Sequence, residues 1–112
     1  MNAQLYERLK KVAIAQDVIA YGDLAPMFGL DMSQAKDRAE IGRLVGAISE
    51  FEHANGRPLL SAVVISKEHN RPGDGFFTLA RTLGLLGSQS EDIFWTGELA
   101  RVHAYWKRYR NV

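Results

Sequence analysis

The sequence predicts one mainly α-helical domain with a small β element. A winged helix-turn-helix-like part spans residues 18–86, and an amphipathic C-terminal helix follows over residues 89–110. Three observations support this. The chain has 112 residues, enough for one hydrophobic core and too few for two. Apolar residues recur at intervals of three and four along several segments, as in helices. Only residues 59–65 form a β-branched run, and a glycine-rich loop follows them, an order found also in proteins that never bind DNA.

Capping and periodicity predict the first elements. Residues 2–16 form an amphipathic helix, whose apolar stripe is Leu5, Leu9, Val12 and Ala13. Residues 17–20 form a brief extended link. A short helix follows over residues 23–28, in which Asp23 is the N-cap, Pro26 lies in the first turn and Gly29 ends the helix.

The middle of the chain is predicted as a long helix, a strand and a loop. The helix covers residues 33–53 and closes at Asn55 and Gly56. Its predicted buried stripe is Ile41, Leu44, Val45, Ile48 and Phe51. Residues 59–65 are the best strand in the chain, and residues 67–75 are a loop by composition.

Two helices complete the chain. The first covers residues 76–83, and Gly84 and Gly87 interrupt the helical pattern after it. The second covers residues 90–110, and its predicted apolar face is Trp95, Leu99, Val102 and Trp106.

Composition limits the function classes. No apolar run approaches the roughly 20 residues of a membrane span, and the charged N-terminal segment does not resemble a signal peptide. Cysteine is absent, which excludes disulfides, thiolate metal sites and thiol nucleophiles, and we expect a cytoplasmic protein with no membrane partner. The net charge of +1 gives no strong argument for nucleic acid. Residues 101–112 hold four cations and no acid, whereas residues 31–52 are slightly acidic, which counts against DNA binding.

Arg43 is the strongest candidate contact residue. Its neighbours at i+3 and i+4 on a helix are Gly46 and Ala47, so the surface around it is almost bare. A bare helix face allows a phosphate backbone or a base step to approach, with the guanidinium as donor or wedge. The alternative is that Gly42 and Gly46 allow tight packing against another helix, with Arg43 at the rim.

The loop after the predicted strand has two interpretations. As a wing, it would use Lys67, His69 and Arg71 to contact phosphates, and its glycines would expose backbone N–H groups. As a plain strand-to-helix turn, it would be anchored in the core by Phe76 and Phe77, and this interpretation is favoured.

Catalysis has little support in the sequence. His53, His69 and His103 lie on three different elements, so no two have metal-ligand spacing on one helix. No nucleophile motif is present, and Glu68 beside His69 is a weak acid/base or ligand candidate. We therefore expect no enzyme, no cofactor and no metal site.

The last helix combines aromatic and basic residues. Aromatic rings beside arginines are able to stack nucleic-acid bases. An aromatic stripe at helical spacing more often packs a helix onto its own domain, which we favour here. A third interpretation is a homodimer seam with Trp95 and Trp106 as anchors.

Four short motifs occur in a familiar order: Tyr21-Gly22-Asp23-Leu24-Ala25, Gly42-Arg43-Leu44-Val45-Gly46, Arg57-Pro58-Leu59-Leu60 and the stretch 73–86. Together they resemble the winged-helix DNA-binding domain of alkylguanine-DNA alkyltransferases and the catalytically inactive alkyltransferase-like proteins. The resemblance covers about residues 18–86 and implies that Tyr21 presses on the DNA backbone and that Arg43 takes the place of a flipped base. The chain is also similar to small bacterial proteins of unassigned function, which implies no activity.

The chain departs from this family at its reactive motif. The family's Pro-Cys-His-Arg sequence should fall near residues 61–64, where this chain has Ser-Ala-Val-Val. Alkyl transfer is excluded, because there is no thiol to accept the group. The segment between Gly29 and Gly42 is longer than the family's turn, and the last helix has no counterpart.

The sequence thus predicts a non-catalytic DNA-binding protein. Its main contacts would be Tyr21 and Arg43, with Arg38, Lys67 and Arg71 on the phosphate backbone. The alternative is a protein-interaction or dimerisation module on a winged-helix scaffold. A small-ligand protein built on Glu68, His69 and the glycine-rich loop is a weaker third candidate.

Overall fold

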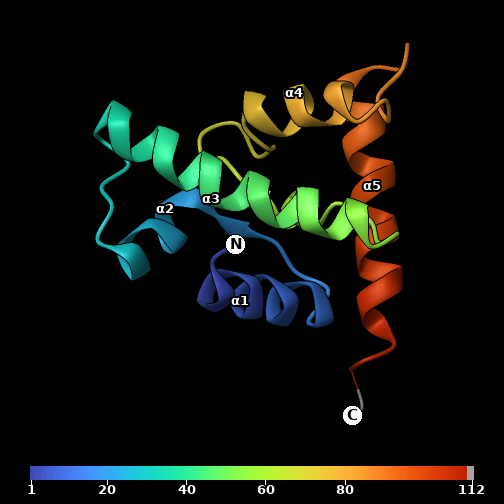
Figure 1. The fold of residues 1–112 in the computed structure, drawn as a ribbon, viewed down its shortest axis with the longest axis horizontal. Coiled ribbons are helices and arrows are strands. Elements are labelled where there is room, and N and C mark those ends of the chain that lie inside the picture. Colours follow the sequence, from blue (N-terminus) through green and yellow to red (C-terminus); the bar gives the residue numbers. More distant parts are fainter. Residues whose placement is uncertain (111–112) are drawn as a thin grey trace.

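The computed structural model describes residues 1–110 and shows a mainly helical protein with a small two-stranded parallel sheet (Figure 1). The last two positions of the predicted domain, 111–112, lie outside the described residues. The elements in chain order are α1 (Ala3–Ile14), β1 (Ile19–Ala20), α2 (Tyr21–Leu24), the 3₁₀ helix η1 (Ala25–Phe28), α3 (Ala35–Ala54), the 3₁₀ helix η2 (Leu60–Val63), β2 (Val64–Ile65), α4 (Asp74–Thr82) and α5 (Glu91–Lys107).

The prediction of α1 is confirmed. The side chain of Asn2 accepts a hydrogen bond from the Leu5 N–H and begins the helix. The buried residues of α1 are the predicted Leu5, Leu9, Val12 and Ala13. After the helix, Gln16 adopts the left-handed region at φ 62°, and its amide donates to the His103 carbonyl at 2.8 Å. The end of α1 is therefore fixed to α5.

The short helix begins earlier than predicted. Asp23 is not the N-cap, because α2 starts at Tyr21 and the extended Ala20 precedes it. Asp23 instead lies in the first turn, where a carboxylate is favourable beside the helix N-terminus. The chain tightens into η1 around Pro26, and Gly29 ends it at φ 69°, as predicted.

The predicted strand over residues 59–65 is wrong in its first part. Residues Leu60–Val63 form η2, and only Val64–Ile65 form β2, which pairs in parallel with β1 in the register Ile19–Val64 and Ala20–Ile65. Side chains supply the backbone partners that a longer strand would have found in a sheet. Glu98 accepts from the Leu59 N–H at 2.8 Å, and Ser49 accepts from the Ser61 N–H at 3.0 Å.

α3 crosses the centre of the molecule, between α4 and α1 (Figure 1). It begins two residues later than predicted and ends before Asn55 and Gly56, as expected. Its buried residues are Ile41, Val45, Ile48, Ser49 and Glu52. The predicted burial of Phe51 is wrong. Its side chain is 40% exposed and packs edge-on against Tyr6, because the buried face is rotated toward the polar positions 49 and 52.

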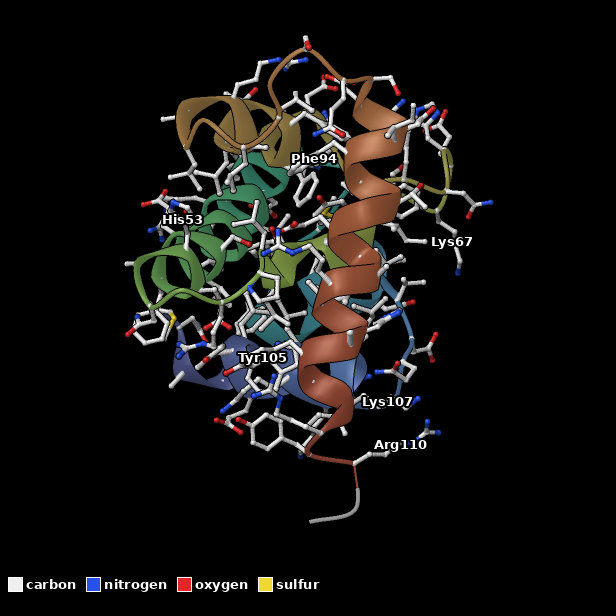
Figure 2. The ribbon with its side chains drawn as sticks, turned by 90° about the vertical axis from the view of Figure 1, so that its right-hand side faces the viewer. His53, Lys67, Phe94, Tyr105, Lys107 and Arg110 are labelled. Carbon is white, nitrogen blue, oxygen red and sulfur yellow. The ribbon has the colours of Figure 1, made fainter. Side chains whose placement is uncertain are left out.

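α5 stands along one edge of the molecule and covers α1 and η2 (Figures 1 and 2). Ser90 caps it by accepting from the Ile93 N–H. Its buried residues, Phe94, Glu98, Val102 and Trp106, recur every four residues. The predicted positions Trp95 and Leu99 are half-buried, and the Trp95 indole donates to the Ala62 carbonyl at 2.9 Å. Both tryptophans thus pack within their own domain. None of the helices in residues 1–110 is long and apolar enough to span a membrane.

Candidate functional site

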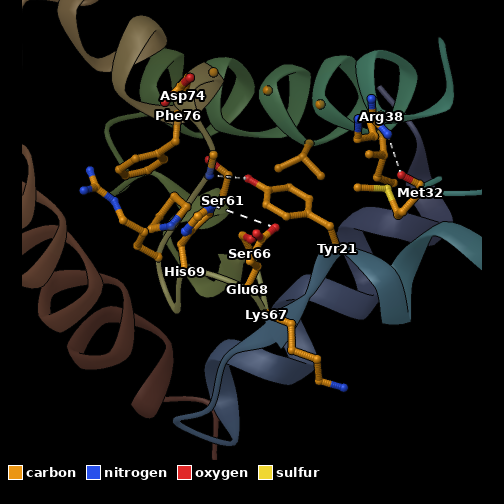
Figure 3. A pocket seen from close by; sticks show the side chains of 18 of the residues that line it. Tyr21, Met32, Arg38, Ser61, Ser66, Lys67, Glu68, His69, Asp74 and Phe76 are labelled. Carbon is orange, nitrogen blue, oxygen red and sulfur yellow. Dashed lines mark hydrogen bonds and ion pairs between the residues drawn. The ribbon is translucent and has the colours of Figure 1, made fainter. Parts of the chain in front are cut away.

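A groove of about 1020 Å³ lies between α2, α3, the loop 66–73 and the start of α4 (Figure 3). It gathers four of the five predicted contact residues beside the bare positions of α3. The residues that line it include Tyr21, Arg38, Gly42, Gly46, Ser61 and Lys67. The loop's Arg71 also lines the groove, whereas Arg43 does not.

Where Gly42 and Gly46 of α3 line the groove, the helix backbone faces open space. A Cβ atom added to Gly42 or Gly46 would meet nothing within 4 Å. The interpretation that these glycines permit close packing against another helix of the domain is therefore wrong. On the neighbouring positions, Ile41 and Val45 are buried and fix the helix to the core.

Tyr21 lines the groove, and its side chain is half-buried and packed against the core. Its hydroxyl accepts a hydrogen bond from the Gly73 N–H at 3.2 Å, across 52 residues of sequence. Burial of the ring raises the pKa of Tyr21. The bond joins the start of α2 to the end of the loop, so Tyr21 helps to set the width of the groove.

Arg38 and Arg43 project from α3 near its N-terminal half. The Arg38 guanidinium donates to the Met32 carbonyl at 2.9 Å and closes the turn before the helix (Figure 3). Arg43 is 67% exposed and forms an ion pair with Glu40 on the same helix. This pair lowers the pKa of Glu40 and raises that of Arg43, through the hydrogen bonds between them. Arg43 is thus exposed on α3, next in sequence to the groove-lining Gly42.

The loop turns back tightly on itself. Ser66 and Arg71 form an antiparallel bridge, and Asn70 adopts the left-handed region at φ 53°. Lys67 is exposed, and its side chain extends away from the groove (Figure 3). His69 lies 3.9 Å from Glu68, and both side chains are exposed, an ordinary surface pair. The loop is anchored by the buried Phe76 and Phe77, as the favoured interpretation predicted.

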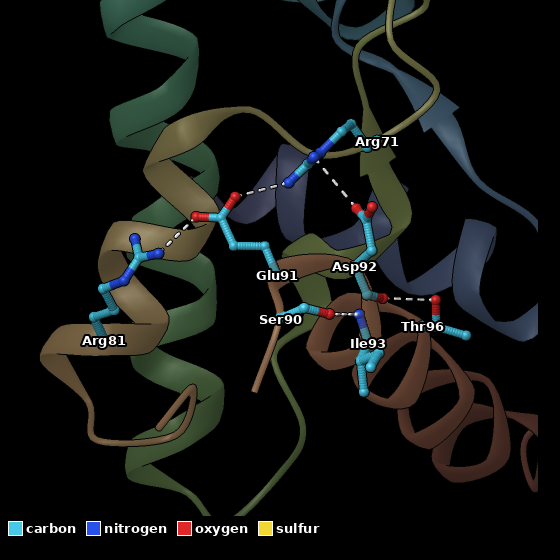
Figure 4. A network of polar contacts seen from close by, with 7 residues as sticks. All are labelled: Arg71, Arg81, Ser90, Glu91, Asp92, Ile93 and Thr96. Atoms are coloured by element: carbon cyan, nitrogen blue, oxygen red, sulfur yellow. Dashed lines mark hydrogen bonds and ion pairs between the residues drawn. The ribbon is translucent and has the colours of Figure 1, made fainter. Parts of the chain in front are cut away.

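Arg71 holds the loop to α5 and is not a free cation. Its guanidinium donates to Glu91 at 2.9 Å and lies 3.3 Å from Asp92 (Figure 4). It also stacks on the ring of Phe77, 4.8 Å from the centroid. Glu91 receives a second cation, Arg81, at 2.7 Å, and the two arginines, Arg81 first, lower the pKa of Glu91. The predicted phosphate contact of Arg71 therefore competes with three local partners, Glu91, Asp92 and Phe77.

Sequence reasoning missed the polar floor of the groove. Ser61 is buried, and its hydroxyl shares a hydrogen bond with the buried hydroxyl of Ser49. A serine within the apolar run 59–65 was the available signal. Among residues 1–110, no three His, Cys, Asp or Glu side chains lie close enough to hold a metal ion.

Comparison of the chain with family models, with curated proteins and with solved structures gave no match.

Proposed function

We propose that the protein binds DNA without catalysis, with α3 as the recognition helix and the groove beside it as the contact surface. The observation that carries this proposal is the open space in front of Gly42 and Gly46, next to the exposed Arg43. In this arrangement α2 with η1 is the first helix of a helix-turn-helix pair, and residues 66–71 take the place of the wing.

The bare face is suited to close approach by a nucleic-acid backbone. Helix interiors disfavour glycine by about 1 kcal/mol relative to alanine, and here no neighbouring atom requires its small size. Two such positions one turn apart leave a strip of exposed backbone. A phosphate or a base step is able to reach this strip, and Arg43 beside it supplies a planar cationic donor.

The ion pair between Arg43 and Glu40 does not prevent this role. Exposed pairs within one helix contribute little free energy, so a phosphate group would replace Glu40 at small cost. The three acids that line the groove, Glu68, Asp74 and Glu91, balance its three cations, Arg38, Lys67 and Arg71. We therefore expect modest affinity that falls as salt rises.

The test is an Arg43→Ala variant, measured by fluorescence anisotropy with a labelled DNA duplex at several salt concentrations. We expect weaker binding and a loss of about 1 from the slope of log K against log salt. Arg8→Ala is the matched control, because Arg8 is an exposed arginine on α1, away from the groove. Circular dichroism should show that both variants keep the fold. If the unsubstituted protein binds neither duplex nor single-stranded DNA at low ionic strength, the proposal is wrong.

The alternative of a dimerisation module has less support. Its proposed anchors, Trp95 and Trp106, are occupied within the chain, since Trp106 is only 6% exposed and Trp95 is bonded to Ala62. Sedimentation of the unsubstituted protein distinguishes the two, because the DNA proposal does not require a dimer.

A further inference from the structure

A second surface lies at the C-terminal end of α5, away from the groove. We call it the α5-end surface; its residues are Tyr6, Phe51, Arg57, Tyr105, Arg108 and Tyr109. They come from α1, the end of α3, the following turn, α5 and the turn after α5, and none of them lines the groove. Phe51 and Tyr109 are 40% and 41% exposed, and both are among the largest exposed apolar side chains of the described protein.

The contacts between these side chains form two clusters, one around Phe51 and one around Tyr105. The rings of Tyr6 and Phe51 lie 5.7 Å apart, and the Arg57 guanidinium lies 5.5 Å from the Phe51 centroid. In the second cluster, the ring centroids of Tyr105 and Tyr109 lie 6.2 Å apart. Each cluster therefore has one exposed ring, Phe51 or Tyr109, and one cation, Arg57 or Arg108.

Arg57 is fixed in place by a buried acid. Its Nε and Nη2 atoms donate to the two oxygens of Glu52 at 3.0 Å each, and Tyr6 donates to the same carboxylate at 2.7 Å. This leaves Nη1 of Arg57 outside the Glu52 pair. At the other end, Arg108 lies over the Tyr105 ring, 4.3 Å from its centroid.

Positive charge gathers at this end of the molecule. Together with Lys10 over the Tyr6 ring and the nearby Lys107 and Arg110 (Figure 2), the surface has five cations against two acids, Glu7 and the buried Glu52. This net +3 exceeds the +1 of the whole chain, so the remainder of the protein is net negative. This positive charge attracts a polyanion to this end of the molecule.

We propose that the α5-end surface binds an unpaired nucleic-acid strand, with bases stacked on Phe51 and Tyr109 and phosphates between them on Arg57 and Arg108. A strand has both the negative backbone and the flat apolar groups that this alternation of rings and cations matches. An acidic peptide would complement the charge but would leave the two exposed rings without partners. The proposal stands independently of the groove.

The experiment compares binding of labelled oligo(dT) to the unsubstituted protein and to Phe51→Ala and Tyr109→Ala. We expect each variant to bind about tenfold or more weakly, since a stacked base depends on its ring. Ile93→Ala is the control, because Ile93 is 66% exposed at the opposite end of α5 and should leave binding unchanged. Melting curves should show all three variants folded, as each substituted side chain is at the surface.

Two further arms separate this proposal from its rivals. Arg43→Ala should leave oligo(dT) binding intact, so failure at the groove and failure at the α5-end surface are distinguishable. The proposal is overturned if Phe51→Ala and Tyr109→Ala bind oligo(dT) as tightly as the unsubstituted protein. It is also overturned if poly-glutamate of equal charge displaces oligo(dT) as well as unlabelled oligo(dT) does.

Discussion

Gly42 and Gly46 offer the sharpest test of the groove, because their effects on stability and on binding should have opposite signs. Both lie inside α3, neither has a positive φ, and an added methyl group would meet no atom within 4 Å. Replacing glycine by alanine in a helix interior then stabilises the fold by about 1 kcal/mol per position. With an unfolding entropy near 2.1 cal/mol/K per residue, that gain raises the melting temperature of a chain of this length by about 4 °C.

The same methyl groups should weaken duplex binding, because they occupy the strip that the DNA backbone approaches. We therefore expect Gly42→Ala and Gly46→Ala to melt higher and bind more weakly, and Gly46→Leu to bind more weakly still. Gly97→Ala is the matched control, since Gly97 is an exposed glycine inside α5 with equally open space. It should show the same stabilisation with unchanged duplex binding.

Two results would refute this reasoning at different points. If alanine at 42 or 46 lowers the melting temperature, the space in front of α3 is not open. If all three substitutions on α3 raise or keep stability and duplex affinity is unchanged, the bare face is not the contact surface.

Three other substitutions test the polar contacts. Glu40→Gln should tighten duplex binding and steepen its salt dependence, because it frees Arg43 and removes a repelling charge; unchanged anisotropy titrations would contradict a role for Arg43. Burial and the bond to Glu52 raise the pKa of Tyr6 to about 12, so its contribution to stability is complete below pH 10 and is lost as pH rises through about 12. Urea unfolding of Tyr6→Phe should therefore show less alkaline destabilisation than the unsubstituted protein over that range, and an equal loss would contradict the assignment. Arg57→Ala leaves the buried Glu52 without its cation and should cost roughly 3 kcal/mol in urea unfolding; a cost below 1 kcal/mol would show that Glu52 does not depend on the pair.

The sequence predicted the helices well where one face is purely apolar. The stripe Leu5, Leu9, Val12 and Ala13 is buried as expected, because periodicity alone decides such a face. The prediction of buried residues from the sequence failed where the buried face of a helix includes acids. Glu52 and Glu98 are buried because partners distant in sequence neutralise or bond them, and no local pattern reveals those partners.

The candidate site shows the same division. The bare strip around Gly42 and Gly46 follows directly from the order of residues on one helix. That order does not show which cations are already paired with acids. Arg71 is held by Glu91, which lies 20 residues later and on another helix, so composition alone could not show that it is already paired. Tyr21 likewise depends on Gly73, 52 residues away.

α5 supports both ends of the segment between residues 59 and 71. Glu98 holds the Leu59 N–H and Glu91 holds Arg71, and these two acids lie two turns apart, about 10 Å along the helix axis. The position of the loop that walls the groove thus depends on the docking of α5. α5 also contributes Tyr105 to the α5-end surface, so one helix supports both the groove and that surface. A ligand that tilts α5 should change amide hydrogen exchange at Gly73, where the loop is bonded to Tyr21.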